Sequence, residues 1–359
     1  MGEEGSGPSR PPRIFYFRLF IPPPTVITPP QVLAPSSKGV AVKILCVIPH
    51  FYRPKADHAA GGNNSSDINR KAERIAVLGE TISAFHQLYG NRVAGLDHWR
   101  KVAWQAASPH RAQIDVIVCT VGDNHLLNSL RISPALYRQA KFDDNFLPTR
   151  LGFGAHMAMR ELAGQYDWYC YVEDDIIMTD PLFFRKRALF DAQFGPEALL
   201  QPNRFENAST FGYKVYPDYV LGRPWTTMHQ DLSDRPELTM EFMGEAVRFE
   251  RTSYPAAGSF CLNAAQLERW VSHPSFLDMD ESFLGPLDSA GILSIMKTFR
   301  VYKPALDHGS FLEVKHGSPR WSPIVGLEQH PIIPRTDPFA GLPGHSPEND
   351  EADAGDGSC

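Results

Sequence analysis

Apolar residues in the central part of the chain follow two alternating patterns. Continuous apolar runs at 42–48 (VKILCVI), 114–120 (IDVIVCT) and 168–172 (WYCYV) are typical of buried parallel strands. Apolar residues at 75–88 recur every three or four positions, and those at 151–162 do the same, which predicts a helix before each later run. This alternation indicates an α/β fold with a doubly wound, largely parallel sheet flanked by helices.

Local signals place the ends of the first helix and suggest further elements. Asp67 is a candidate N-cap, and Gly90 stands where a C-terminal cap is expected. The later elements expected from the pattern are short strands at 198–201 and 311–314, a small-residue loop at 254–261 (YPAAGSFC), and helices at 264–271 and 289–299.

Composition divides the chain into three parts. Residues 1–40 are rich in Pro, Gly and Ser, and the pattern predicts a disordered lead-in. Residues 331–359 end in an acidic run and are expected to form a disordered tail. The segment 41–330 is then expected to be one folded domain.

Charge and hydropathy exclude some classes of protein. The formal net charge of -6 argues against a general nucleic-acid binder. The apolar patch at 14–21 is interrupted by Arg18 and followed by three prolines, so no membrane span is expected. Five cysteines form no CxxC pair; those inside apolar runs suggest buried free thiols and reduced, cytoplasmic surroundings.

Three consecutive acids, Glu173, Asp174 and Asp175, follow directly after the run at 168–172. Ligands usually bind at the carboxyl end of such a strand in an α/β sheet. Adjacent carboxylates repel one another unless a cation compensates them, and oxygen ligands suit Mg²⁺ or Mn²⁺. The triplet therefore predicts a site for a metal ion and a nucleotide diphosphate, while the alternative is a solvated acidic turn.

Several of these segments together resemble the nucleotide-sugar glycosyltransferases of the GT-A fold, a Rossmann-type fold. The opening strand resembles the nucleotide-binding start of that fold, and the EDD sequence resembles its DxD-type metal motif. The loop at 255–260 (PAAGSF) resembles the segment that lines the donor and acceptor pocket. Asp288 resembles the base of inverting members, and 316–321 (HGSPRW) resembles their late histidine segment.

The resemblance implies roles for particular residues in binding the donor. Asp175 is expected to coordinate the metal, with Glu173 and His316 as further ligands and His308 as a competitor to His316. Glu173 and Asp174 are expected to share ribose and sugar-hydroxyl contacts. The loop residues Gly258 and Ser259 are expected to contact the donor.

The same resemblance implies an inverting transfer, which needs a general base for the acceptor hydroxyl. Asp288 is the first candidate, although it could merely cap a helix, and Glu281 or Asp280 could serve instead.

Basic residues beside the first two helices are further candidates for nucleotide contacts. Arg70 and Arg74 could contact the diphosphate or remain solvated. His156 and Arg160 could reach the nucleotide.

The resemblance implies a metal-dependent glycosyltransferase that moves a sugar from a nucleotide sugar to a saccharide, lipid or protein acceptor. The segment 205–251, with Tyr213, Tyr216, Tyr219 and Trp225, is expected to build the acceptor side. Three alternatives remain: a nucleotidyltransferase that uses the same acids, a non-catalytic nucleotide-sugar or protein-binding module, and an interaction protein without a small ligand.

Overall fold

The computed structural model describes residues 42–54, 67–106, 112–208, 211–219, 229–327 and 330–332. The expected lead-in 1–40, Trp225 and nearly all of the expected tail lie outside these residues. The helices are α1 (Lys71–Leu88), α2 (Leu151–Glu161), α3 (Phe183–Phe194), α4 (Ala264–Val271), α5 (Pro286–Asp288) and α6 (Ser294–Thr298).

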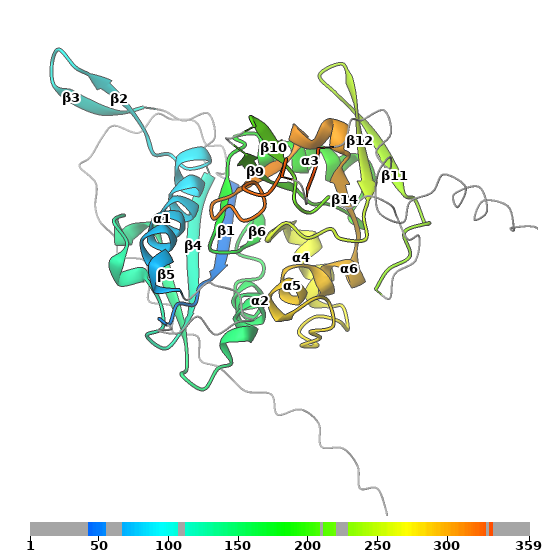
Figure 1. The fold of residues 1–359 in the computed structure, drawn as a ribbon, viewed down its shortest axis with the longest axis horizontal. Helices are drawn as coiled ribbons and strands as arrows, with labels where there is room; N and C mark the ends of the chain where they lie inside the picture. The colour runs from blue at the N-terminus through cyan, green and yellow to red at the C-terminus, as the bar shows by residue number, and fades with distance from the viewer. Residues whose placement is uncertain are drawn as a thin grey trace, which may run out of the picture.

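A five-stranded sheet forms the centre of the fold, in the order β13-β6-β1-β4-β5 (Figure 1). These strands are β1 (Val42–Pro49), β4 (Ala112–Val121), β5 (Arg138–Phe142), β6 (Trp168–Val172) and β13 (Ser259–Asn263). The four strands β1, β4, β5 and β6 run parallel, and β13 runs antiparallel to β6. The prediction of an α/β fold with a largely parallel sheet is confirmed.

Helices cover both faces of β1, which explains its uninterrupted apolar sequence. Ile44 and Cys46 belong to the apolar core that includes residues of α1, whereas Leu45 and Val47 belong to the core that includes residues of α2. Successive side chains of a strand point to opposite faces, so a strand buried on both faces needs apolar residues throughout.

The two cap candidates of the first helix lie close to the ends of α1, although the residue directly before α1 is Arg70. Asp67 accepts a hydrogen bond from the Asn69 backbone and caps a short 3₁₀ helix, Ile68–Arg70, that leads into α1. At the other end, the Gly90 N–H donates to the His86 carbonyl oxygen. A Cβ atom on Gly90 would lie 2.6 Å from that oxygen, so the position favours glycine.

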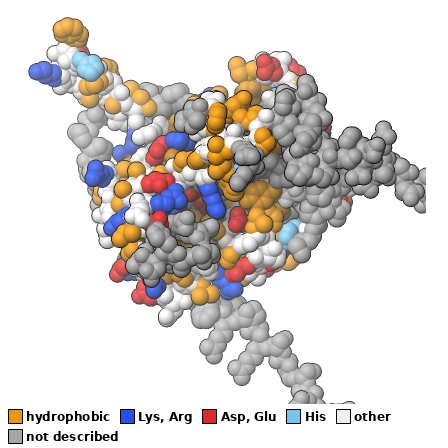
Figure 2. Space-filling model, in the orientation of Figure 1, with side chains coloured by type: hydrophobic (Ala, Val, Ile, Leu, Met, Phe, Trp, Pro, Cys, Tyr) orange, Lys and Arg blue, Asp and Glu red, His pale blue; other side chains and the backbone are white. Residues whose placement is uncertain are grey.

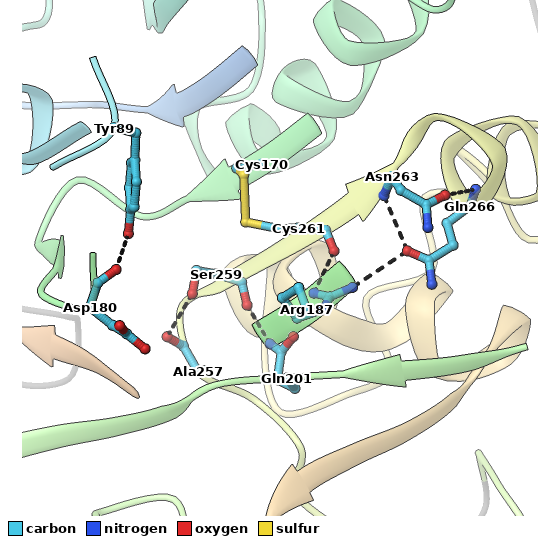
Figure 3. Close-up of a disulfide and its surroundings, with 10 residues drawn as sticks. All are labelled: Tyr89, Cys170, Asp180, Arg187, Gln201, Ala257, Ser259, Cys261, Asn263 and Gln266. Atoms are coloured by element: carbon cyan, nitrogen blue, oxygen red, sulfur yellow. Dashed lines mark hydrogen bonds between the residues drawn. A yellow bond between two sulfur atoms is a disulfide. The ribbon is translucent and has the colours of Figure 1, made fainter. Parts of the chain in front are cut away.

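The segment 254–261 is a loop only in its first part. Its last three residues begin β13, whose antiparallel pairing with β6 places Cys261 directly opposite Cys170. The two cysteines, 4.1 Å apart at Cα, form a disulfide (Figure 3). The interpretation of Cys170 as a free thiol is therefore wrong, whereas Cys46 and Cys119 are buried and free.

A buried arginine connects α3 to the same strand (Figure 3). Arg187 donates from Nη1 to the Cys261 carbonyl oxygen at 2.8 Å and from Nη2 to Gln266 Oε1 at 3.4 Å. Gln266 and Asn263 form a capping box at the start of α4. These contacts fix β13, and with it the loop that precedes it, against the sheet.

Three smaller sheets complete the described part of the chain. One has the order β10-β9-β15-β7, another β11-β12-β14-β8, and β2 pairs only with β3. Their strands are β7 (Ile176–Met178), β9 (Asn203–Ala208), β10 (Tyr213–Val215), β15 (Glu313–His316), β8 (Ala198–Leu200), β11 (Glu237–Phe242), β12 (Glu245–Arg251), β14 (Arg300–Pro304), β2 (Val93–Asp97) and β3 (Val102–Ala106). Among the described residues, no helix is long and apolar enough to cross a membrane.

Candidate functional site

A cavity of about 800 Å³ opens where β1 and β6 end. Pro49, the last residue of β1, lines it together with the three acids that follow β6. The polar and charged residues of this lining are Arg70, Arg74, Glu173, Asp174, Asp175, Arg204, Tyr254, Asp288, His316, Ser318 and Arg320. Five segments that are separated in the sequence therefore contribute charged side chains to one pocket at the carboxyl edge of the parallel sheet.

Asp174 is held by two partners from the first third of the chain. Its Oδ2 lies 2.5 Å from His50 Nδ1 and 2.5 Å from Arg74 Nη2. Because His50 Nε2 accepts the Leu126 N–H at 3.0 Å, the singly protonated ring carries its proton on Nδ1 and donates it to Asp174. Asp174 thus fixes the positions of β1, α1 and the acidic turn relative to one another.

These partners also keep Asp174 ionised. Burial opposes ionisation, but the positive charge of Arg74 and the hydrogen bond from His50 outweigh it, and the pKa of Asp174 lies below its ordinary value. The predicted contact of Asp174 with ribose or a sugar hydroxyl stays a prediction.

Asp175 and His316 face each other in the pocket. Asp175 Oδ2 lies 3.3 Å from His316 Nε2. His316 stands at the end of β15, and its Nδ1 lies 2.7 Å from Glu206 Oε1 on β9. Hydrogen bonding of Nδ1–H to the buried Glu206 leaves Nε2 directed at Asp175, an arrangement typical of metal-binding histidines.

Glu206 also organises the loop that closes this side of the pocket. Its carboxylate accepts backbone N–H groups of Arg320, Trp321 and Ser322 at 2.7–3.1 Å. Burial disfavours the charge, but the hydrogen bonds from His316 and from this loop lower the pKa of Glu206 to about 2. Sequence reasoning missed Glu206, because the polar sequence of 203–208 (NRFENA) gives no sign that its one acidic residue is buried.

Glu173 packs against the loop before β13. Its N–H donates to the Gly258 carbonyl oxygen at 2.8 Å. A Cβ atom on Gly258, whose φ is +62°, would lie 3.1 Å from Glu173 Oε2. Burial, together with the negative charge of Asp175, raises the pKa of Glu173 to about 8. Neither Gly258 nor Ser259 belongs to the pocket lining. Ser259 is buried, and its hydroxyl is 3.5 Å from the Ala257 carbonyl oxygen.

Asp288 is the one candidate base that lines the pocket. It lies in α5 and accepts a hydrogen bond from the Tyr254 hydroxyl at 3.4 Å, while burial raises its pKa above the ordinary value. The two other candidates form ion pairs outside the lining of this cavity: Glu281 with Arg150 at 2.5 Å, and Asp280 with Lys297 at 2.7 Å.

Four arginines supply positive charge to the pocket. Arg74 pairs with Asp174 as above, and Arg70 donates two hydrogen bonds to Glu73. Arg204 binds the Asp218 carboxylate through two nitrogens, at 3.0 and 2.5 Å. The Arg320 guanidinium lies 5.3 Å from the centre of the Trp321 ring at the rim.

Three residues singled out in the sequence lie elsewhere. His308 pairs with Asp307 at 3.2 Å and is not part of the pocket lining. His156 is buried among aromatic rings, and Arg160 lies 3.4 Å from Glu161. None of the three lines the pocket that contains the acidic triplet.

The pocket offers part of a ligand set for a metal ion. In the described part of the chain, no group of three or more His, Cys, Asp or Glu side chains is arranged to hold one. Asp175 and His316 nevertheless present an oxygen and a nitrogen to the same space. Mg²⁺ and Mn²⁺ sites commonly use one or two protein ligands and complete their shell with water and substrate phosphates, so this donor set fits such an ion.

Comparisons with known proteins leave the family open. No protein-family description and no curated protein matches the sequence. Among solved structures, the chain is similar to CMP:2-keto-3-deoxy-manno-octonic acid synthetase complexed with CTP, at 11% identity over 73% of this chain and 90% of that one. The TM-score of 0.28 is too low for this likeness to support any conclusion on fold or function.

Proposed function

We propose that this chain is a metal-dependent transferase that moves a sugar from a nucleotide sugar to an acceptor hydroxyl, with residues 41–330 as its catalytic domain. The observation that carries the proposal is one pocket that contains both the Asp175–His316 pair and Asp288. The pair is suited to hold a cation beside the diphosphate of the donor, and Asp288 is suited to take up the proton of the attacking hydroxyl.

In the proposed reaction, the acceptor hydroxyl oxygen attacks the anomeric carbon while Asp288 takes up the hydroxyl proton. The bond between that carbon and the diphosphate oxygen breaks, and the diphosphate leaves with the bonding electrons. A divalent cation held by Asp175 and His316 would neutralise the charge that develops on this leaving group.

The surroundings of Asp288 suit a general base. Burial raises its pKa, which increases its affinity for a proton relative to a solvated aspartate. The Tyr254 hydroxyl holds one carboxylate oxygen, Oδ1, and leaves the other for the acceptor. Arg70 and Arg320 line the same pocket and suit phosphate oxygens by charge and geometry.

Nucleotidyl transfer is the second candidate, and the arginines of the pocket favour it. Four arginines line the cavity, which would also suit the three phosphates of a nucleoside triphosphate. The same carboxylates would then hold the metal for phosphoryl chemistry, and pyrophosphate would be the product.

Product analysis separates the two reactions. The purified chain is incubated with Mn²⁺ and either nucleotide sugars or nucleoside triphosphates with sugar phosphates. Glycosyl transfer, or donor hydrolysis with water as acceptor, releases a nucleoside diphosphate. Release of pyrophosphate from a triphosphate would instead establish the nucleotidyltransferase.

Substitution of the base gives a second test. Asp288→Asn is expected to reduce turnover by about 10²–10⁴-fold and leave donor binding unchanged, because the amide cannot accept the proton. Glu281→Gln is the matched control, since Glu281 pairs with Arg150 outside the pocket lining. Equal turnover by wild type and Asp288→Asn would contradict the assignment of the base.

A further inference from the structure

A hairpin projects from the body of the protein and packs on no other sheet. Strands β2 and β3 pair only with each other and extend away from the end of α1 (Figure 1). An isolated two-stranded hairpin is at best marginally stable in water without a surface to pack against.

The side chains of this hairpin are unusually apolar for their exposure. Trp99, in the turn between the strands, is 96% exposed, and Leu96 and Trp104 are 60% and 54% exposed. Figure 2 shows hydrophobic side chains gathered along the projection, with basic and histidine side chains beside them. Clustered exposure of this kind marks a surface that binds a partner.

The hairpin holds these residues in a defined arrangement. Asp97 Oδ1 accepts the backbone N–H groups of Trp99 and Arg100, each at 2.9 Å, which fixes the turn. On the strands, the Trp104 ring lies against Gly95, where a Cβ atom would be 2.3 Å from the ring. The exposed tryptophans therefore belong to a hairpin that is ordered by hydrogen bonds and side-chain packing.

Apolar residues occupy both faces of the hairpin. Gly95 pairs with Trp104 and Leu96 pairs with Ala103, so Trp104 and Leu96 point to opposite faces. A protein partner that covers one face would leave the other in water. A lipid bilayer that surrounds the tip would bury both faces.

The charges near the tip favour an anionic partner. Residues 91–106 contain Arg92, Arg100 and Lys101 against a single carboxylate, Asp97, which itself pairs with Arg100 at 3.1 Å. The whole chain carries a formal net charge of -6, so the excess of basic residues in this segment is opposite in sign to the charge of the chain. Tryptophan beside Lys and Arg is typical of segments that lie at the interface of an anionic bilayer.

We propose that the β2–β3 hairpin inserts its tip, with Trp99 foremost, into the interfacial region of a bilayer that contains anionic lipids. Lys101 and Arg100 meet the lipid headgroups, and Trp99 and Leu96 enter the layer below them. The proposal is independent of the reaction assigned to the pocket.

Vesicle flotation with the full chain tests this directly. Vesicles of phosphatidylcholine alone are compared with vesicles of phosphatidylcholine and phosphatidylserine. About tenfold more protein is expected on the anionic vesicles, and high salt should release it, because the attraction of the cations is screened. Trp99→Ser and Lys101→Glu are each expected to reduce binding by about fivefold or more.

The β11–β12 turn supplies a matched control. Met243 is 88% exposed there and stands between Glu241 and Glu245, so Met243→Ser removes an equally exposed apolar side chain from an acidic hairpin. This variant should bind vesicles as the wild type does.

Other outcomes would overturn the proposal. These are no flotation of the folded wild type, equal binding to both vesicle types, full binding by Trp99→Ser, or an equal loss in Met243→Ser. Sedimentation velocity without lipid distinguishes a protein contact: self-association that Trp99→Ser abolishes, with no vesicle binding, would assign the hairpin to a second copy of the chain.

Discussion

His156 should make the protein sensitive to acid, and the size of the effect follows from its surroundings. The imidazole is 1% exposed, and rings of Tyr171 and Trp270 have their centres 5.6 and 4.8 Å from its own. Its Nε2 has no hydrogen-bond partner. Burial lowers the pKa of His156 from 6.5 to about 3. The neutral ring is compatible with this site, and the protonated ring is not.

The sign of the effect is set by the unfolded state, which binds the proton more tightly. The stability associated with neutral His156 is fully present above about pH 6.5 and is lost as the pH falls from there towards about 3. Linkage gives a loss of roughly 3 kcal/mol in the free energy of unfolding between about pH 7.5 and pH 4.5.

Urea unfolding of the wild type and of His156→Leu at both pH values measures this loss. Other titrating groups contribute equally to the two proteins, so the difference between their pH dependences isolates His156. The wild type should lose roughly 3 kcal/mol more than the variant. The same acid dependence in both proteins would refute a neutral, buried His156.

Three further predictions concern the surroundings of the site. Glu206→Gln should weaken Mn²⁺ binding by about 10- to 100-fold in a calorimetric titration, because the partner that orients the histidine loses its charge; unchanged affinity would count against a metal at this place. Gly258→Ala should lower the free energy of unfolding by about 1–3 kcal/mol, because the new Cβ would lie 2.8 Å from the Ile176 side chain at a φ of +62°. Gly164→Ala, at a φ of +78° with nothing within 4 Å, carries only the backbone strain, and equal losses in the two variants would contradict the close contact. Without reductant, alkylation of the unfolded chain followed by peptide mapping should leave Cys170 and Cys261 unmodified, whereas modification of both would contradict the disulfide.

Local patterns in the sequence were enough to predict three of the five strands of the central sheet. The apolar runs at 42–48, 114–120 and 168–172 became β1, β4 and β6, because a strand buried on both faces has a continuous signal. The acids after β6 could be recognised for the same reason: they interrupt such a run abruptly. Of the proposed site residues, Asp175, Asp288 and His316 do line one pocket.

Features that depend on pairing between distant segments could not be predicted. Cys170 and Cys261 are separated by 91 positions and meet only because β13 pairs with β6. Glu206 and His316 are separated by 110 positions, and nothing near either residue indicates the other. The β2–β3 hairpin lacks a continuous apolar run, since Gly95 and Asp97 interrupt its first strand.

The central claim is that the acids after β6 bind a nucleotide through a divalent cation. The most direct measurement is a calorimetric titration of UDP-, GDP-, CMP- and dTDP-sugars against the purified protein, with and without Mn²⁺. Asp175→Ala is the test variant and Asp280→Ala the control, since Asp280 pairs with Lys297 outside the pocket lining.

The account predicts that one nucleotide class binds only with Mn²⁺, that Asp175→Ala abolishes this binding, and that Asp280→Ala retains it. Absence of binding to every nucleotide by folded protein, or equal affinity in Asp175→Ala, would contradict the account.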